Sequence, residues 1–297
     1  MKQDFSQKEK LMNTKPYFAN FEHDHATIHV DPILYNVFYL LLRTLLCVPR
    51  DRSGIVYDVE MSWRDDHKES MTYAANLGGA WTKKDEEQFN ALRELLGADT
   101  STLRCFWEKF YEYFKQKREA DMLRNMMVAI VQPSEPADMF SHVRQILDEH
   151  STCAHVQHLA LKTPDIRGFH NHAVARGAQF VTPLLYDEKN DLVQVFGGEL
   201  YHPRSETASG LFLEFVERRP NPELREEGTR NRELFFRDKT FLSLYGYKQA
   251  EYESKKIVPF ILPELFRELY TVVGSKKFWD ITEDDVAVAE KLMMARK

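Results

Sequence analysis

The alternation of apolar and polar residues along the chain is typical of an α+β protein. Strand-like patterns, either alternating with period two or short and apolar throughout, occur at 26–30, 54–63, 126–131, 156–161, 178–182, 192–197 and 211–216. Helix-like patterns, with apolar residues three and four positions apart, occur at 32–47, 137–150, 165–176, 262–273 and 283–295. From position 156 the elements follow in the order βαβββ. The first half fits the same order if the charged and aromatic helical segment 83–120 is an insertion.

The pattern therefore predicts two paired βαβββ modules with a helical insertion and a C-terminal helical extension. We expect an N-terminal arm at 1–24, a first module at 25–135, a second module at 136–220 and a helical cap at 221–297. No letter-for-letter repeat relates the modules, so their duplication is inferred from pattern alone. For the insertion, packing against the core and an oligomer contact both remain open, and a homo-oligomer is compatible with the sequence.

The composition is that of an ordinary globular chain, with 297 residues, 43% apolar and 29% charged. A formal net charge of −6, without a strongly basic segment, gives no reason to expect nucleic acid as a partner. The first residues lack the apolar core of a secretory signal, and the longest apolar run is interrupted by Asn36 and Arg43. We therefore expect no membrane span.

Three cysteines, Cys47, Cys105 and Cys153, are widely spaced and form no CxxC pair. They suggest neither a disulfide framework nor a thiolate zinc site. The sequence thus favours a reducing compartment, and we predict a cytoplasmic protein.

Polar residues interrupt strands that otherwise look buried. His158 and Gln157 lie in "AHVQHLALK", Gln194 lies in "DLVQVFG", and Glu214 lies in "LFLEFVE". A buried carboxylate without a partner costs several kcal/mol, roughly, whereas a metal ion removes this cost and needs neutral imidazole and ionised carboxylate as ligands. Two histidines and one carboxylate on one face would form the facial triad of non-haem Fe(II) oxygenases. A hydrogen-bonded core histidine and a water-facing glutamate remain the alternative, because spacing alone does not show that the two residues meet.

Several segments resemble one family in the same order along the chain. The segments are "EPADMFSHVRQILDEH", "VQHLALKTPDI", "DLVQVFGGELY", "GLFLEFVERR" and "FRDKTFLSLYGYKQAE". They are similar to the metal-binding C-terminal half of the 4-hydroxyphenylpyruvate dioxygenase and hydroxymandelate synthase family, within the vicinal oxygen chelate superfamily. The resemblance covers about 133–253.

This resemblance implies an iron site built from both modules. His158 and Glu214 would be iron ligands, and "HDHATIHVDPILYNV" makes His25 the candidate for the first ligand, since the family has a short Asp-His strand there. His23 and His29 fall on the same face of an ideal strand, so either remains an alternative to His25. The resemblance also implies substrate contacts, which are the amides Gln157 and Gln194 as catalytic residues and Ser134, Phe236 and Phe241 as substrate-binding residues.

The implied function is an Fe(II)-dependent dioxygenase that oxidatively decarboxylates and hydroxylates one 2-oxo acid, using O2 and no separate 2-oxoglutarate. Where the family has Asn before Glu-Pro, this chain has Ser134, and where the family has Gln in the next helix, this chain offers Ser141, His142 or Val143. A substrate that is aromatic and 4-hydroxyphenylpyruvate-like, or a related acid, therefore remains open. Two alternatives keep the fold: an extradiol-type ring-cleaving dioxygenase that uses Tyr201 or His202 for acid–base chemistry, and a metal-free small-molecule-binding protein.

Overall fold

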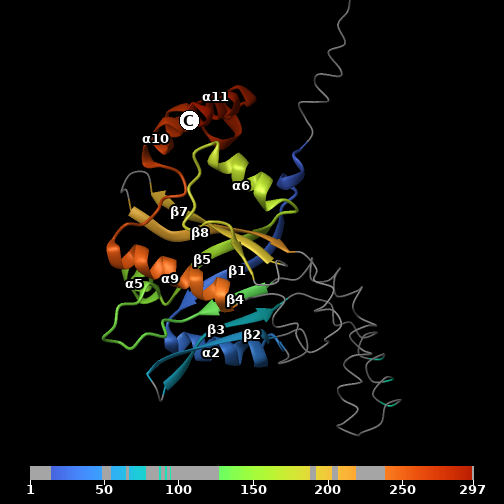
Figure 1. The fold of residues 1–297 in the computed structure, drawn as a ribbon, viewed down its shortest axis with the longest axis vertical. Helices are drawn as coiled ribbons and strands as arrows, with labels where there is room; N and C mark the ends of the chain where they lie inside the picture. Colours follow the sequence, from blue (N-terminus) through green and yellow to red (C-terminus); the bar gives the residue numbers. More distant parts are fainter. Residues whose placement is uncertain are drawn as a thin grey trace, which may run out of the picture.

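One mixed sheet of eight strands forms the centre of the part of the chain that the computed structural model describes (Figure 1). The described residues are 15–48, 55–64, 67–77, 127–187, 192–202, 207–218 and 238–295, with isolated positions at 87, 91 and 94. The strands lie in the order β2-β3-β4-β1-β5-β8-β7-β6.

Each half of the sheet is one βαβββ module. The first consists of β1 (Glu22–Val30), α2 (Pro32–Thr44), β2 (Ile55–Arg64), β3 (His67–Asn76) and β4 (Met127–Val131). The second consists of β5 (Ala154–Lys162), α6 (Ile166–Val174), β6 (Leu185–Tyr186), β7 (Leu192–His202) and β8 (Thr207–Arg218). In both modules the first strand pairs in parallel with the fourth, and the third strand lies between the fourth and the second. The predicted α+β fold of paired βαβββ modules is confirmed.

The two modules meet through their first strands, β1 and β5, which are antiparallel. His25 is paired with Ala160, and Thr27 is paired with His158. A pseudo-twofold axis therefore passes between these two pairs and relates His25 to His158.

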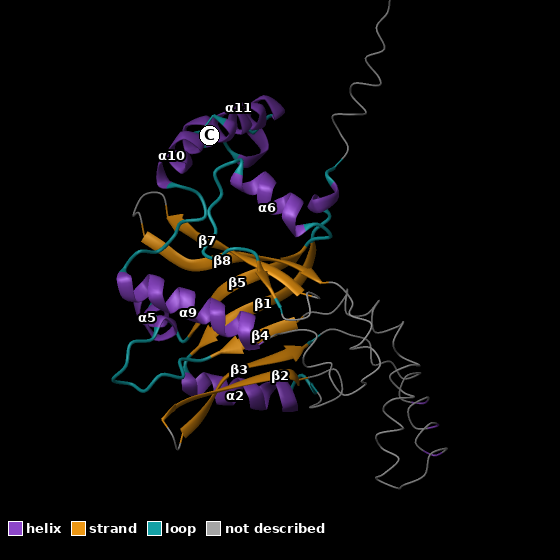
Figure 2. Cartoon of the chain, viewed as in Figure 1, coloured by secondary structure: helices purple, strands orange, loops and turns teal. Residues whose placement is uncertain are grey.

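Helices cover both faces of the sheet (Figure 2). On one face, Met127, Ala129 and Val131 of β4 pack against Val143 of α5 (His142–Glu149) and Tyr245 of α9 (Asp238–Ser254). On the other face α2 packs over the first module and α6 over the second. Because residues paired directly across a ladder share a face, His25, Thr27 and His29 project toward α5 and α9.

The remaining described helices are η1 (Tyr17–Ala19), α10 (Pro263–Val273), η2 (Phe278–Asp280) and α11 (Glu283–Met294). The sequence patterns predicted α10 and α11 to within a residue. No described helix is long and apolar enough to cross a membrane.

Two expected elements differ in the structure. The helix predicted from 137 begins only at His142, because Ser141 is its N-cap and accepts a hydrogen bond from the backbone of Arg144 at 3.4 Å. The strand predicted at 178–182 is wrong, since Ala178 and Phe180 form only isolated bridges and β6 follows at Leu185.

One strand was missed. The sequence of β3, "HKESMTYAAN", lacks the apolar alternation of its neighbours, yet the strand pairs with both β2 and β4. The predicted insertion at 83–120 lies almost entirely outside the described residues, as do 1–14 and 219–237.

Candidate metal centre

Three buried side chains from three strands converge where the two modules meet. His25 comes from β1, His158 from β5 and Glu214 from β8, and each is about 2% exposed. Nε2 of His25 lies 3.1 Å from Nε2 of His158 and 3.3 Å from Oε2 of Glu214, and His158 Nε2 lies 3.1 Å from the same oxygen. These atoms form a small triangle of potential ligands.

The triangle has the dimensions that a divalent metal ion requires. Ligand atoms about 2.1 Å from a metal lie about 3.0 Å apart at right angles and about 3.4 Å apart at the tetrahedral angle. The three observed separations fall between these values. Two imidazoles and one carboxylate on one side of a metal leave further coordination positions for exchangeable ligands.

The pseudo-twofold axis explains why there are three ligands rather than four. Thr27 of β1 pairs with Ala129 of β4, and the equivalent Ala160 of β5 pairs with Glu214 of β8. Ala129 therefore occupies the position equivalent to Glu214 and has no ligand atom. The fourth symmetry-related position of the site therefore carries the methyl side chain of Ala129.

A buried ion pair fixes the orientation of the His25 imidazole through its Nδ1, the ring nitrogen that does not belong to the ligand triangle. His25 Nδ1 lies 2.8 Å from Oδ2 of Asp24, which accepts the hydrogen bond, and His25 Nε2 faces the other two ligands. Arg218 of β8 donates to Asp24 from Nε to Oδ1 and from Nη2 to Oδ2, at 2.7 Å each. A β-bulge between His23 and His25 allows both Asp24 and His25 to be buried.

That bulge also decides between the candidate first ligands. His23 is exposed, so the expectation that it shares a face with His25 is wrong for this strand. His29 is fully buried on the same face as His25 but does not belong to the ligand triangle. Only His25 of the three is brought to His158 and Glu214.

Outside the ligand triangle, His158 has two uncharged polar neighbours. Its Nδ1 donates to Oε1 of Gln157 at 3.0 Å, and Thr27 Oγ1 lies 2.9 Å from its Nε2. Gln157 thus lies behind the imidazole, a contact that the sequence did not indicate. Its predicted contact with substrate stays a prediction.

The ionisation of the three side chains is coupled. Burial alone would lower the pKa of His25, but the carboxylates of Glu214 and Asp24 outweigh it and raise the pKa to about 9. Burial would raise the pKa of Glu214, yet the two histidines lower it to about 2. The pKa of His158 is lowered, mainly by burial. Glu214 is therefore ionised, and a cation that binds at His25 Nε2 displaces a proton.

No protein-family model and no curated protein matches this chain. Among solved structures it is similar to a variant of 4-hydroxymandelate synthase from Streptomyces coelicolor, with 14% identity and a TM-score of 0.40 over 73% of this chain and 54% of that chain. It is also similar to methylmalonyl-CoA epimerase from Streptomyces coelicolor (12% identity, TM-score 0.35, 66% and 96% covered) and from Mycobacterium tuberculosis (15%, 0.33, 73% and 97%). The chain spans about half the length of the 4-hydroxymandelate synthase structure.

The strand order of both modules and their pairing through β1 and β5 identify the architecture. The chain has the vicinal oxygen chelate fold. Within this fold the ligand triangle occupies the junction of the two modules, and α9 covers the same face of the sheet.

The other predicted site residues have different environments. Gln194 lies on β7 opposite Val216 of β8, on the face of the sheet that carries Glu214 two residues away. Phe241 of α9 is partly buried against the core beneath α5 and α9. Ser134 is fully buried in the loop that follows β4. Phe236 lies outside the described residues.

Two buried histidines on this face were not predicted as a pair. His29 and His142 have ring centroids 5.7 Å apart, and neither nitrogen of His29 has a hydrogen-bond partner among the described residues. His142 Nδ1 donates to Gln249 Oε1 at 2.9 Å, which leaves Nε2 as an acceptor without a partner. Buried polar atoms of this kind are rare unless a ligand or an ordered water satisfies them.

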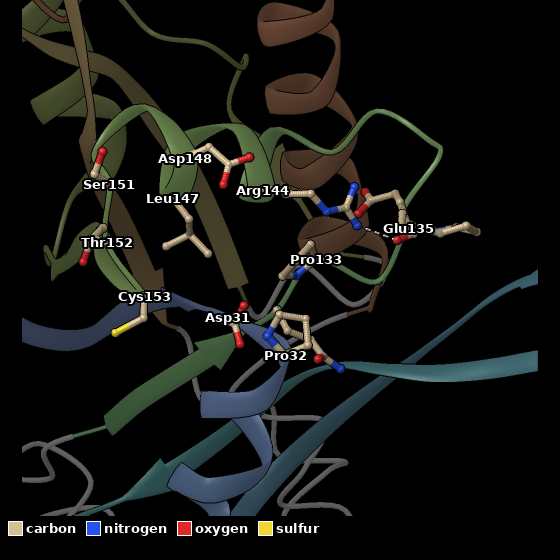
Figure 3. A pocket seen from close by; sticks show the side chains of 13 residues that line it. Asp31, Pro32, Pro133, Glu135, Arg144, Leu147, Asp148, Ser151, Thr152 and Cys153 are labelled. Atoms are coloured by element: carbon tan, nitrogen blue, oxygen red, sulfur yellow. Dashed lines mark hydrogen bonds between the residues drawn. The ribbon is translucent and has the colours of Figure 1, made fainter.

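The cavity in Figure 3 lies elsewhere. It has a volume of about 1000 Å³ and contains none of the three ligand residues. Asp31, Glu135, Arg144 and Asp148 are among the residues that line it. The side chain of Arg144 donates to the backbone carbonyls of Glu135 and Met139. Arg144 thus stabilises the loop before α5, while Asp31 caps the N-terminus of α2.

His142 should make stability fall in mild acid. Burial, with Lys248 of α9 adding to it and the Gln249 hydrogen bond opposing it, lowers the pKa of His142 to about 3. His29 of β1 and Tyr245 and Tyr252 of α9 also face its ring. The folded state keeps His142 neutral, while the unfolded chain binds a proton below about pH 6.5, so stability is lost as the pH falls from about 6.5 toward 3.

We expect His142 to contribute a loss of about 2 kcal/mol between pH 7 and pH 5. Urea unfolding of the wild type and of His142→Gln at both values measures this contribution as the difference between their pH dependences. Parallel pH dependences of the two proteins would contradict the expectation. The pKa of His29 is lowered mainly by burial, a cause that both proteins share, so most of its contribution is common to them.

Proposed function

We propose that the protein is a non-haem Fe(II)-dependent dioxygenase that oxidatively decarboxylates and hydroxylates a 2-oxo acid. The observation that carries the proposal is the buried triangle of His25, His158 and Glu214. Two neutral imidazoles and one carboxylate on one side of a metal are the ligand set typical of Fe(II) oxygenases. Fe(II) bound there would activate O2 for reaction with a 2-oxo acid. The acid would chelate the iron through its carboxylate and keto oxygens.

The protein's own contribution would be orientation and exclusion of water. Phe196 of β7 and Phe212 of β8 are buried, and the Phe212 ring lies 5.0 Å from the ring of His158. These rings would limit the access of bulk water to the site beside His158. Thr27 and Gln194 offer uncharged hydrogen-bonding groups, which can hold a substrate oxygen without changing the charge of the site.

The far end of the substrate would meet His29 and His142. Successive residues on one face of a strand are about 6.6 Å apart, and His29 lies one such step beyond Thr27. One ring or a short chain spans this distance. Because His142 Nε2 is an acceptor, a hydroxyl group at that end of the 2-oxo acid fits better than an anion.

The ring-cleaving alternative has less support. Tyr201 and His202 pair with Ala208 and Thr207, about 20 Å along β8 from Glu214. At that distance along the strand the two positions are too far from the metal ligands to supply the acid–base groups expected of an extradiol enzyme.

The experiment that tests the proposal measures metal, oxygen and carbon dioxide together. Anaerobically purified protein loaded with Fe(II) is expected to bind about one iron per chain and to release one CO2 for each O2 consumed with a 2-oxo acid. The panel should hold aromatic and aliphatic 2-oxo acids, with and without a distal hydroxyl, and catechols. Oxygen uptake with catechols and no CO2 would favour ring cleavage. Folded protein that binds no metal would favour a metal-free binding protein and end the proposal.

A further inference from the structure

Each of the two candidate histidine ligands is preceded by a residue that holds its Nδ1. Asp24 precedes His25 and Gln157 precedes His158, and the pseudo-twofold axis that relates the histidines also relates these two residues. Both side chains accept from Nδ1, at 2.8 Å for Asp24 and 3.0 Å for Gln157. The arrangement is repeated, but one partner is a carboxylate and the other an amide.

Asp24 is kept ionised inside the protein by Arg218. The Asp24 side chain is 4% exposed, and both of its oxygens accept from the guanidinium at 2.7 Å. A guanidinium that donates to both oxygens of a buried carboxyl group favours its ionised form. The Asp24–Arg218 pair is neutral overall, so it adds no net charge beside the metal site. Because both Asp24 oxygens accept from Arg218, they are not available as ligands for another cation.

We propose that Asp24, held by Arg218, is a positioning residue that makes His25 the stronger of the two imidazole ligands. A hydrogen bond to a carboxylate is about twice as strong as one between neutral groups, and it increases the electron density at the opposite ring nitrogen. The amide of Gln157 fixes the orientation of His158 with a smaller effect on its donor strength. The site would thus have two unequal imidazoles in geometrically equivalent positions. This inference rests on the proposed metal site.

Metal titration of matched variants tests the inference without an activity assay. Anaerobic Fe(II) and Co(II) titrations should give Asp24→Asn a dissociation constant about 10 to 100 times that of the wild type. Gln157→Leu should show a smaller increase. The visible absorption of bound Co(II) should shift to lower energy in Asp24→Asn, because the ligand field weakens. Glu22→Gln removes an exposed carboxylate from the same strand, and its dissociation constant should stay within about twofold of the wild type.

A double variant separates ligand strength from folding. Asp24→Asn removes the carboxylate that accepts from the partly buried Arg218 in the structure, which lowers the melting temperature of the metal-free protein. In Asp24→Asn with Arg218→Met this melting temperature should recover, while the dissociation constant stays raised. A dissociation constant that returns to the wild-type value together with stability would overturn the inference, as would equal values for Asp24→Asn and Glu22→Gln. Wild-type protein that binds no metal would instead remove the proposed metal site itself.

Discussion

Replacement of Glu214 by alanine is expected to abolish stoichiometric Fe(II) binding and to lower oxygen uptake with a 2-oxo acid by at least about a thousandfold. Glu214 is the one anionic member of the ligand triangle, and its oxygen lies 3.1–3.3 Å from both imidazole ligand atoms. Without it two neutral imidazoles remain, and a cation loses its charge-neutralising ligand in a buried site. A thousandfold loss corresponds to about 4 kcal/mol of transition-state stabilisation. His158→Ala should have an effect of the same size.

Metal analysis, oxygen uptake and thermal melting with and without Fe(II) measure these effects together. A ligand at a hundred times its dissociation constant stabilises the folded state by about 2.7 kcal/mol, so the wild type should melt higher with iron and the variants should not. Glu22→Ala serves as the control, since Glu22 is exposed and forms an ion pair with Lys162 at 3.6 Å, away from the ligand triangle. A folded Glu214→Ala protein that still binds one iron with wild-type affinity would remove Glu214 from the ligand set.

The fold could be predicted because most of its strands show the pattern that burial imposes. β5, β7 and β8 are half or fully buried, and their apolar runs appear in the sequence. β3 was missed because its polar residues give no such signal, and its place depends on pairing with β2 and β4. The strand predicted at 178–182 shows the opposite failure, in which an apolar segment finds no continuous partner.

The part of the candidate site that could be predicted consists of polar residues that lie in otherwise apolar strands. A histidine and a glutamate in apolar strands raised the hypothesis of a shared metal ion beside that of a hydrogen-bonded histidine and a water-facing glutamate, and the structure brings His158 and Glu214 together with His25. The contact between Asp24 and Arg218 gave no signal, because the two residues are 194 positions apart and depend on the ladder through β1, β5 and β8. The bulge that buries Asp24 and exposes His23 breaks the period of two on which the sequence argument relied.

The second large effect is expected at Lys248 of α9, a lysine that is 1% exposed on the face that carries the metal site. Its Nζ lies 2.6 Å from Oε1 of Glu199 on β7 and 5.1 Å from the centre of the Phe212 ring. Lys248→Met should lower the free energy of unfolding by about 3–5 kcal/mol, because it leaves Glu199 buried without its cation. Urea unfolding of the metal-free protein measures the loss, and Lys256→Met, at an exposed position just after α9, should change stability by less than about 0.5 kcal/mol.

A double variant shows whether the loss at Lys248 comes from the uncompensated charge. Oε2 of Glu199 also accepts from the backbone of Gly210 at 2.8 Å and from the hydroxyl of Tyr252 at 3.1 Å, so a neutral amide with its oxygen in this position can keep both contacts. Lys248→Met combined with Glu199→Gln should therefore recover part of the stability that Lys248→Met loses. If the two losses simply add, the lysine stabilises α9 through packing on Phe212 rather than through its charge. Phe212 also contacts the metal-ligand candidate His158. The same variants should therefore weaken metal binding only if they displace α9 and disturb this contact.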